Sequence, residues 1–152
     1  MSSKIGRRRI AAVAALVTFA AATGAATSVR ATVATTHSAS APKTVEVQML
    51  GDAKGYRFSP AKITLQRGDK VKFTLVSGPP HNVVFWEDSI PKGAAAKLGK
   101  AMPNTVGPLT GPFLLNVGDT YVISSTGLPV GTYHYYCAPH LALGMHATIE
   151  LK

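Results

Sequence analysis

The chain has 152 residues, 46% of them hydrophobic, and a formal net charge of +9. This length suits one domain, and the hydrophobic content is sufficient for a core. Because the lysines beyond the N-terminus are spread singly rather than clustered in a stripe, nucleic-acid binding has little support.

The N-terminus has the pattern of an export signal. A basic start, "KIGRRR", precedes an apolar run over residues 10–22, and small residues follow over residues 23–28. This order is typical of a secretory signal. We predict a signal peptide over residues 1–31, with its cleavage site between residues 22 and 41, and a flexible tether over residues 32–42.

An uncleaved membrane anchor is the alternative for the same segment. The apolar run is shorter than the about 20 residues that span a bilayer, so we expect no stable membrane insertion after the signal is removed. The predicted location is the periplasm or another extracytoplasmic compartment, with the thylakoid lumen included. Without residues 1–31, 11 basic residues remain against 7 acidic ones, which leaves a net charge of +4.

From residue 44 onward the sequence alternates between apolar and polar residues. The segments "TVEVQML", "DKVKFTLV", "TYVISS" and "MHATIEL" have this period of two, and Gly, Pro, Asn and Asp separate them. Short alternating runs at this spacing predict an all-β fold, a β-sandwich in a single domain over residues 43–152.

One segment interrupts this rhythm. Residues 91–112 are rich in proline and glycine, and we predict a long connection that crosses between the two sheets. Within it, "AAAKLGKAM" predicts one or two helical turns.

The only cysteine, Cys137, is followed by His140 and Met145 in a C-x2-H-x4-M spacing, and His81 lies upstream in "GPPHNVVFWED". The thiol could be a buried apolar group, a nucleophile or a metal ligand. A thiolate, two imidazoles and a thioether favour copper, because both sulfur donors are soft. Such a set accommodates the cuprous and the cupric ion alike, which favours fast electron transfer.

The predicted strand and loop geometry around Cys137 brings these groups together. Cys137 ends a strand on its core face, and Pro139 cannot continue a central ladder, so His140 returns from a loop. Met145 is then the first residue on the inner face of the last predicted strand. The same alternation turns two neighbouring histidines away from the predicted site, His134 and His146.

The stretches "PHNVVFWEDSIPKG" and "GTYHYYCAPHLALGM" resemble plastocyanin and, more broadly, the blue-copper cupredoxins that include pseudoazurin. The resemblance covers residues 45–152. It implies a Greek-key, cupredoxin-like sandwich that holds one type 1 copper, Cu(I) or Cu(II), and shuttles single electrons between larger redox proteins; it implies no enzyme activity. It also implies four copper ligands, namely His81, Cys137, His140 and Met145.

The resemblance assigns supporting roles to four more residues. Asn82 matches the residue whose hydrogen bonds tie the ligand loops together, and Tyr136 matches an exposed tyrosine on a remote electron path. Pro139 and Leu141 would form an apolar rim around His140, whose edge would be exposed. Trp86 would either pack against neighbouring residues or widen that rim.

Two further expectations concern function. The mild positive charge predicts transient redox partners with an acidic docking surface, and we expect a monomer. A periplasmic protein that binds and delivers copper is the alternative to an electron carrier. A thiol nucleophile has less support, because the sequence shows neither a glycine-rich oxyanion turn nor a third group to orient the histidine.

Overall fold

The structure is a computed structural model, and it describes residues 41–152. The predicted signal peptide and residues 32–40 of the predicted tether lie outside the described residues.

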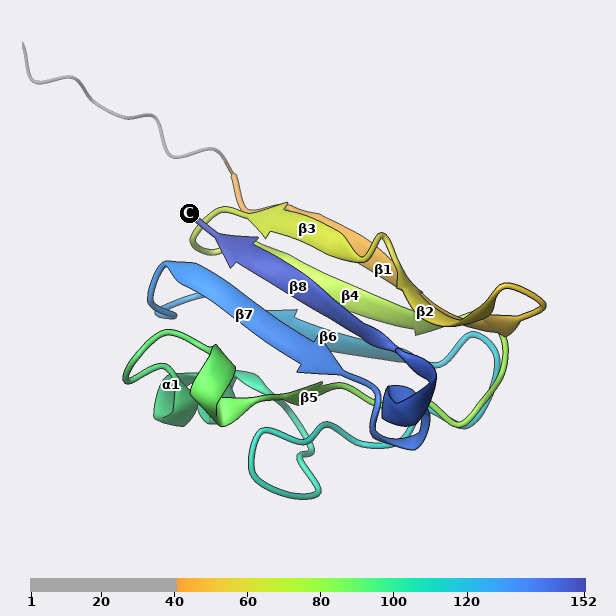
Figure 1. Ribbon diagram of the computed structural model, residues 1–152. Helices are drawn as coiled ribbons and strands as arrows, with labels where there is room; N and C mark the ends of the chain where they lie inside the picture. The colour runs from red at the N-terminus through yellow and green to blue at the C-terminus, as the bar shows by residue number, and fades with distance from the viewer. Residues whose placement is uncertain (1–40) are drawn as a thin grey trace, which may run out of the picture. The chain divides into compact units, whose positions relative to one another are not determined.

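Two four-stranded sheets face each other (Figure 1). The first has the order β2 (Gly55–Ser59), β1 (Thr44–Asp52), β4 (Lys70–Leu75) and β6 (Thr120–Ser124). The second has the order β3 (Lys62–Leu65), β8 (His146–Leu151), β7 (Gly131–Tyr136) and β5 (Val84–Phe85). The pairs β1–β4 and β3–β8 are parallel, and the other pairs are antiparallel.

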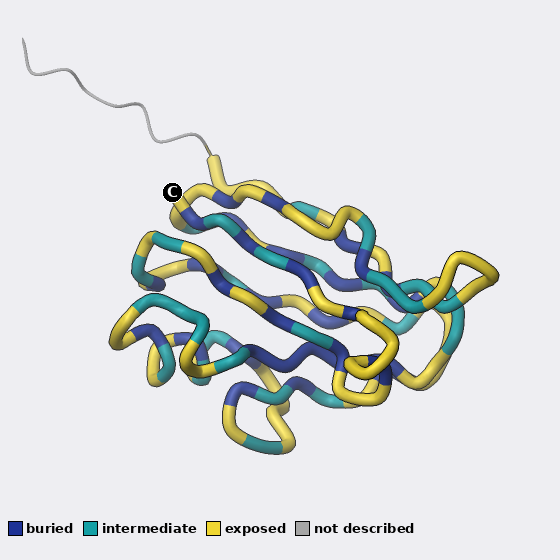
Figure 2. The backbone as a smooth tube through the Cα atoms, viewed as in Figure 1, coloured by how far each residue is buried: buried dark blue, intermediate teal, exposed yellow. Residues whose placement is uncertain are grey.

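The core lies between the sheets, and strand alternation fills it. Along β4 the side chains of Val71, Phe73 and Leu75 are buried, and the residues between them are more exposed. Figure 2 shows the same alternation of buried and exposed positions along the strands. One face of each strand is therefore apolar because it packs against the other sheet, which confirms the predicted β-sandwich.

The connection over residues 91–112 leads from β5 in one sheet to β6 in the other, as predicted. It contains α1 (Ala95–Ala101), which follows the short 3-10 helix η1 (Glu87–Ser89). Leu98 and Met102 are buried, so this segment covers an end of the core instead of projecting into solvent. Within residues 41–152, no helix has the length and apolar character needed to cross a membrane.

One end of the sandwich gathers the segments that carry the predicted ligands. The 3-10 helix η2 (Ala138–Leu143) joins β7 to β8 there, beside the β1–β2 hairpin (Figure 1). Gly144 ends η2 with a φ of 83°, a left-handed conformation that glycine adopts without a steric penalty, and β8 begins directly after Met145.

Candidate metal centre

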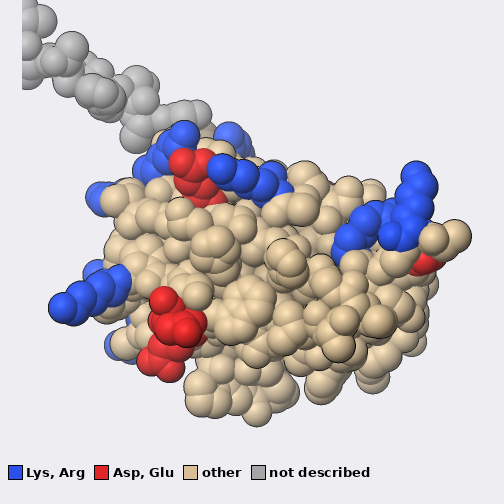
Figure 3. All heavy atoms as spheres, in the orientation of Figure 1, with Lys and Arg blue, Asp and Glu red and all other residues tan. Residues whose placement is uncertain are grey.

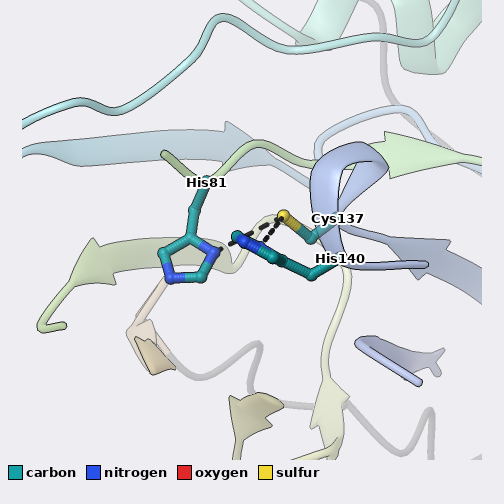
Figure 4. A group of neighbouring side chains, drawn as sticks. All are labelled: His81, Cys137 and His140. Carbon is teal, nitrogen blue, oxygen red and sulfur yellow. Dashed lines mark hydrogen bonds between the residues drawn. The ribbon is translucent and has the colours of Figure 1, made fainter. Parts of the chain in front are cut away.

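Three potential metal donors converge at this end of the sandwich (Figure 4). The Sγ atom of Cys137 lies 3.5 Å from Nδ1 of His81 and 3.4 Å from Nδ1 of His140. The three donor atoms lie within 4.8 Å of one another, and all three residues are buried. The structure thus brings together, among residues 41–152, a thiol and two imidazoles that the sequence places in two distant segments.

Backbone hydrogen bonds fix the segment that carries Cys137, His140 and Met145. The N–H of Cys137 donates to the Met145 carbonyl at 3.0 Å, and the N–H of Met145 donates to the His140 carbonyl at 3.1 Å. The N–H of His140 in turn donates to the Cys137 carbonyl at 3.1 Å. These three bonds close the loop on itself and so fix the backbone from which the three side chains project.

Hydrogen bonds fix both the backbone and the ring of His81. Its backbone exchanges two hydrogen bonds with Leu114, of 3.1 and 2.7 Å. Its Nε2 lies 2.9 Å from the Ser77 carbonyl oxygen, which can only accept, so Nε2 carries the proton. The lone pair of the neutral ring then lies on Nδ1, the atom that faces Cys137, as a metal ligand requires.

Burial favours the neutral forms of all three groups. It lowers the pKa of His81, against the opposing effect of the Ser77 carbonyl. Burial, together with the nearby His81, also lowers the pKa of His140. Burial raises the pKa of the Cys137 thiol, although the backbone N–H groups of Asn82 and His140 act in the opposite direction. A metal cation that binds here must therefore displace the thiol proton.

The dimensions of the cluster fit a trigonal N2S site. Bonds of about 2.0 Å to imidazole nitrogen and about 2.3 Å to thiolate sulfur, 120° apart, separate nitrogen from sulfur by about 3.7 Å. The two separations in the structure, 3.5 and 3.4 Å, are within a few tenths of an ångström of this value. Met145, with no exposed surface, belongs to the same closed loop and carries a soft thioether.

Tyr56 is part of this site, although no sequence pattern indicates it. Its ring stacks on the imidazole of His140 with centroids 3.7 Å apart and planes 10° from parallel, and it meets His81 edge-on at 6.1 Å. Gly51 makes room for it, because a Cβ at that position would lie 2.5 Å from Cε1 of Tyr56. Nothing local in "KGYRFS" indicates this contact, since it arises only when the β1–β2 hairpin folds against η2.

The stack limits the exposure of His140, the ligand whose edge is expected to be exposed. Only 7% of the surface of His140 is exposed, because Tyr56 covers one face of its ring. His140 is still the most accessible of the predicted ligands, since His81, Cys137 and Met145 have none. Of the predicted rim residues, Pro139 and Leu141 are both exposed.

The remaining predicted residues fall into two groups. Asn82 accepts a hydrogen bond of 2.8 Å from the N–H of Ala138 through Oδ1, and so joins the two segments that carry the donors. Tyr136 lies on the outer face of β7, where the ring of Trp86 packs against it with centroids 4.5 Å apart. Trp86 therefore packs beside Tyr136. Two histidines are exposed and lie outside the donor cluster, His134 and His146.

Comparisons with known proteins agree with this geometry. Residues 45–152 match the family described as copper binding proteins, plastocyanin/azurin family. Plastocyanin A/B from Petroselinum crispum is 36% identical over 108 residues, which are 70% of this chain and 99% of that protein. Plastocyanin B'/B'' from Nicotiana tabacum is 39% identical over 109 residues, 71% of this chain and all of that one.

A solved structure of a plastocyanin is similar to this chain as well. The oxidized form of plastocyanin from Dryopteris crassirhizoma aligns with 71% of this chain and 100% of its own, with a TM-score of 0.56 and 31% identity. These matches confirm the predicted cupredoxin fold, the copper cofactor and the class of electron carriers rather than enzymes. The chain belongs to the plastocyanin/azurin family of copper-binding proteins.

Proposed function

We propose that this protein carries one electron at a time on a single type 1 copper ion held by His81, Cys137, His140 and Met145. The observation that supports this assignment is the buried N2S cluster, in which a thiol lies within 3.5 Å of two imidazole nitrogens. When bound, copper supplies a redox centre that alternates between its two valences.

The chain contributes rigidity to this function. Hydrogen bonds fix the backbone of Cys137, His140 and Met145, the Ser77 carbonyl fixes the His81 ring, and Tyr56 covers the ring of His140. Side chains held in this way move little when the charge at their centre changes. Small rearrangement lowers the barrier to electron transfer, and burial keeps water away from the thiolate.

The enclosed site favours an electron carrier over a copper-delivery protein. Delivery requires ligands that a partner can displace, whereas three of the four proposed ligands have no exposed surface. The test is a comparison of the copper-loaded protein with its Cys137→Ser variant. We expect an intense visible band and reversible reduction in the first and neither in the second. A variant that keeps the band would refute the assignment of Cys137.

The proposed docking surface at the copper end combines apolar and basic groups. Leu141 and Leu143 are exposed on η2 beside His140, and Lys54 is exposed on the β1–β2 hairpin. Arg57 of the same hairpin is paired with Asp52 at 2.7 Å. Figure 3 shows one group of blue atoms over this hairpin and others at the opposite end of the molecule. An acidic partner would be attracted here, so rates should fall as salt rises; rates that do not change with ionic strength would refute this docking.

Export to an extracytoplasmic compartment is part of the proposal and is supported by the signal pattern over residues 1–31. N-terminal sequencing of the protein recovered from an expressing cell tests it. We expect a new N-terminus between residues 22 and 41, and a mature protein that starts at Met1 would contradict it.

A further inference from the structure

The end of the sandwich opposite the predicted copper ligands carries exposed basic residues. Lys43, Arg67 and Lys70 are exposed, and backbone hydrogen bonds join their segments. The N–H of Lys70 donates to the Lys43 carbonyl at 2.8 Å, and the N–H of Arg67 donates to the Lys152 carbonyl at 3.1 Å. Because Met145 precedes β8 and Lys152 follows it, these segments lie a full strand length from the copper ligands (Figure 1).

The helix α1 adds two more exposed lysines, Lys97 and Lys100, which lie one turn apart. They border a hollow of about 420 Å³ whose lining also includes two hydroxyl residues at the end of β6, Ser124 and Thr126. Lys70 pairs with Ser124 across β4 and β6, so the hollow adjoins the other basic segments.

The basic end is defined by five exposed residues, Lys43, Arg67, Lys70, Lys97 and Lys100. None of them forms an ion pair with a carboxylate of residues 41–152. The carboxylate of Asp69 lies among them, but it is buried and accepts hydrogen bonds from backbone N–H groups. Glu87 and Asp88 of η1 are exposed, and neither lines the hollow. The basic end therefore presents uncompensated positive charge to its surroundings.

The hollow has the groups that bind a phosphate. The Ser124 hydroxyl donates to Oγ1 of Thr126 at 3.0 Å, so the hydroxyl proton of Thr126 is free to donate to a ligand. Lys97 and Lys100 on the other side supply ammonium groups, which bind phosphate as point charges.

We propose that the basic end binds a bilayer that contains anionic lipids, with one lipid phosphate in the hollow between Lys97, Lys100 and Thr126. The proposal rests on the export that is part of the proposed function, because the mature protein meets such a bilayer outside the cytoplasm. It does not depend on copper binding.

The position of the basic end favours a bilayer over an acidic redox protein. Its charges come from separate segments and form a broad surface. The six residues of β7 separate it from Cys137 by about 20 Å, a distance at which electron exchange with a bound partner would be slow. A bilayer at this end instead leaves the copper end free. The predicted tether joins the domain at the same end, and Lys43 follows it directly.

Vesicle sedimentation measures this binding in the mature, copper-loaded protein at low ionic strength. The probes are vesicles of phosphatidylcholine alone and vesicles that contain phosphatidylglycerol in equal part. We expect binding to the anionic vesicles only, and its loss as salt rises. Lys97→Gln should weaken it about fivefold, the effect of one basic residue near an anionic membrane. Lys54→Gln removes the same charge from the β1–β2 hairpin and should leave binding unchanged.

A second experiment tests the orientation and the hollow. In the reduced protein, anionic vesicles with spin-labelled headgroups should broaden the amide NMR signals of Lys97, Lys100 and Thr126 and spare those of η2. Thr126→Val should weaken vesicle binding about twofold to tenfold, and Thr126→Ser, which keeps the hydroxyl, should restore it.

Equal binding to both kinds of vesicle would overturn the proposal, and so would equal effects of Lys97→Gln and Lys54→Gln or broadening confined to η2. Inorganic phosphate or a hexaglutamate peptide that displaces the protein from vesicles by binding the same residues more tightly would assign a soluble ligand instead. None of these measurements uses the copper spectrum or the N-terminal sequence. A type 1 spectrum and a processed N-terminus without vesicle binding would refute only the bilayer contact.

Discussion

Replacing Tyr56 by leucine tests whether the aromatic stack helps to retain the metal. In the folded protein the Tyr56 and His140 rings lie 3.7 Å apart and 10° from parallel, a closer and flatter contact than the other aromatic pairs at residues 41–152. Aromatic pairs contribute about 0.5–1.5 kcal/mol beyond their buried area. If this energy holds the imidazole in its binding position, its loss should raise the rate of copper dissociation about twofold to tenfold.

The assay is the decay of the visible copper band after a chelator is added in excess. Tyr56→Phe is the matched control, because it keeps the ring and removes only the hydroxyl, and we expect it to lose copper at the wild-type rate. Thermal unfolding of the metal-free variants shows whether the fold is intact. A Tyr56→Leu protein that is folded and loses copper no faster than wild type would refute the role of the stack.

Three further predictions concern stability. The Tyr135 hydroxyl is buried without a hydrogen-bond partner among residues 41–152, so Tyr135→Phe should raise the free energy of unfolding by about 1 kcal/mol. The Tyr133 hydroxyl donates to the Pro129 carbonyl at 2.6 Å, so Tyr133→Phe should lower the free energy of unfolding by about the same amount. Urea unfolding that shows the same sign for both variants would contradict the reasoning. Burial opposes the ionisation of Asp69, but two backbone N–H donors at 2.9 Å outweigh it and hold its pKa below the ordinary 3.8. The stability that the ionised carboxylate contributes is present above the unfolded-state pKa and is lost as pH falls through the lower folded-state pKa. Asp69→Asn should therefore lower the free energy of unfolding by about 1–3 kcal/mol at neutral pH and by less near pH ~2. A loss that does not vary with pH in denaturant titrations would exclude this cause. Gly51→Ala would place a Cβ 2.5 Å from the Tyr56 ring, so it should destabilise the fold by about 1–3 kcal/mol and speed copper loss, and a variant with wild-type unfolding and copper retention would show that the ring has room to move.

The strands could be predicted because each has one face in the core. In β4 and β8 the buried positions alternate in the sequence as they do in space, so the pattern alone identifies them. The proposed ligands could be predicted for a different reason. A cysteine, two histidines and a methionine at these spacings are a rare combination, and their chemistry restricts what they can do together.

The rest of the site depends on contacts between distant segments. Tyr56 reaches His140 only because the β1–β2 hairpin packs on η2, and no local pattern encodes that packing. The same contact explains why only 7% of the surface of His140 is exposed. From the sequence, Trp86 could either pack against neighbouring residues or widen the rim around His140. The pairing of β5 with β7 brings Trp86 beside Tyr136, so it packs there.

The most direct test of the proposed function is the visible and electron-paramagnetic resonance spectrum of the copper-loaded protein. Coordination by the Cys137 thiolate and the two imidazoles, with a weak thioether, predicts an intense blue absorption and a cupric signal with unusually small copper hyperfine splitting, both lost on one-electron reduction and recovered on reoxidation. A pale protein with the large splitting of ordinary tetragonal copper, or one that binds no copper, would contradict the account.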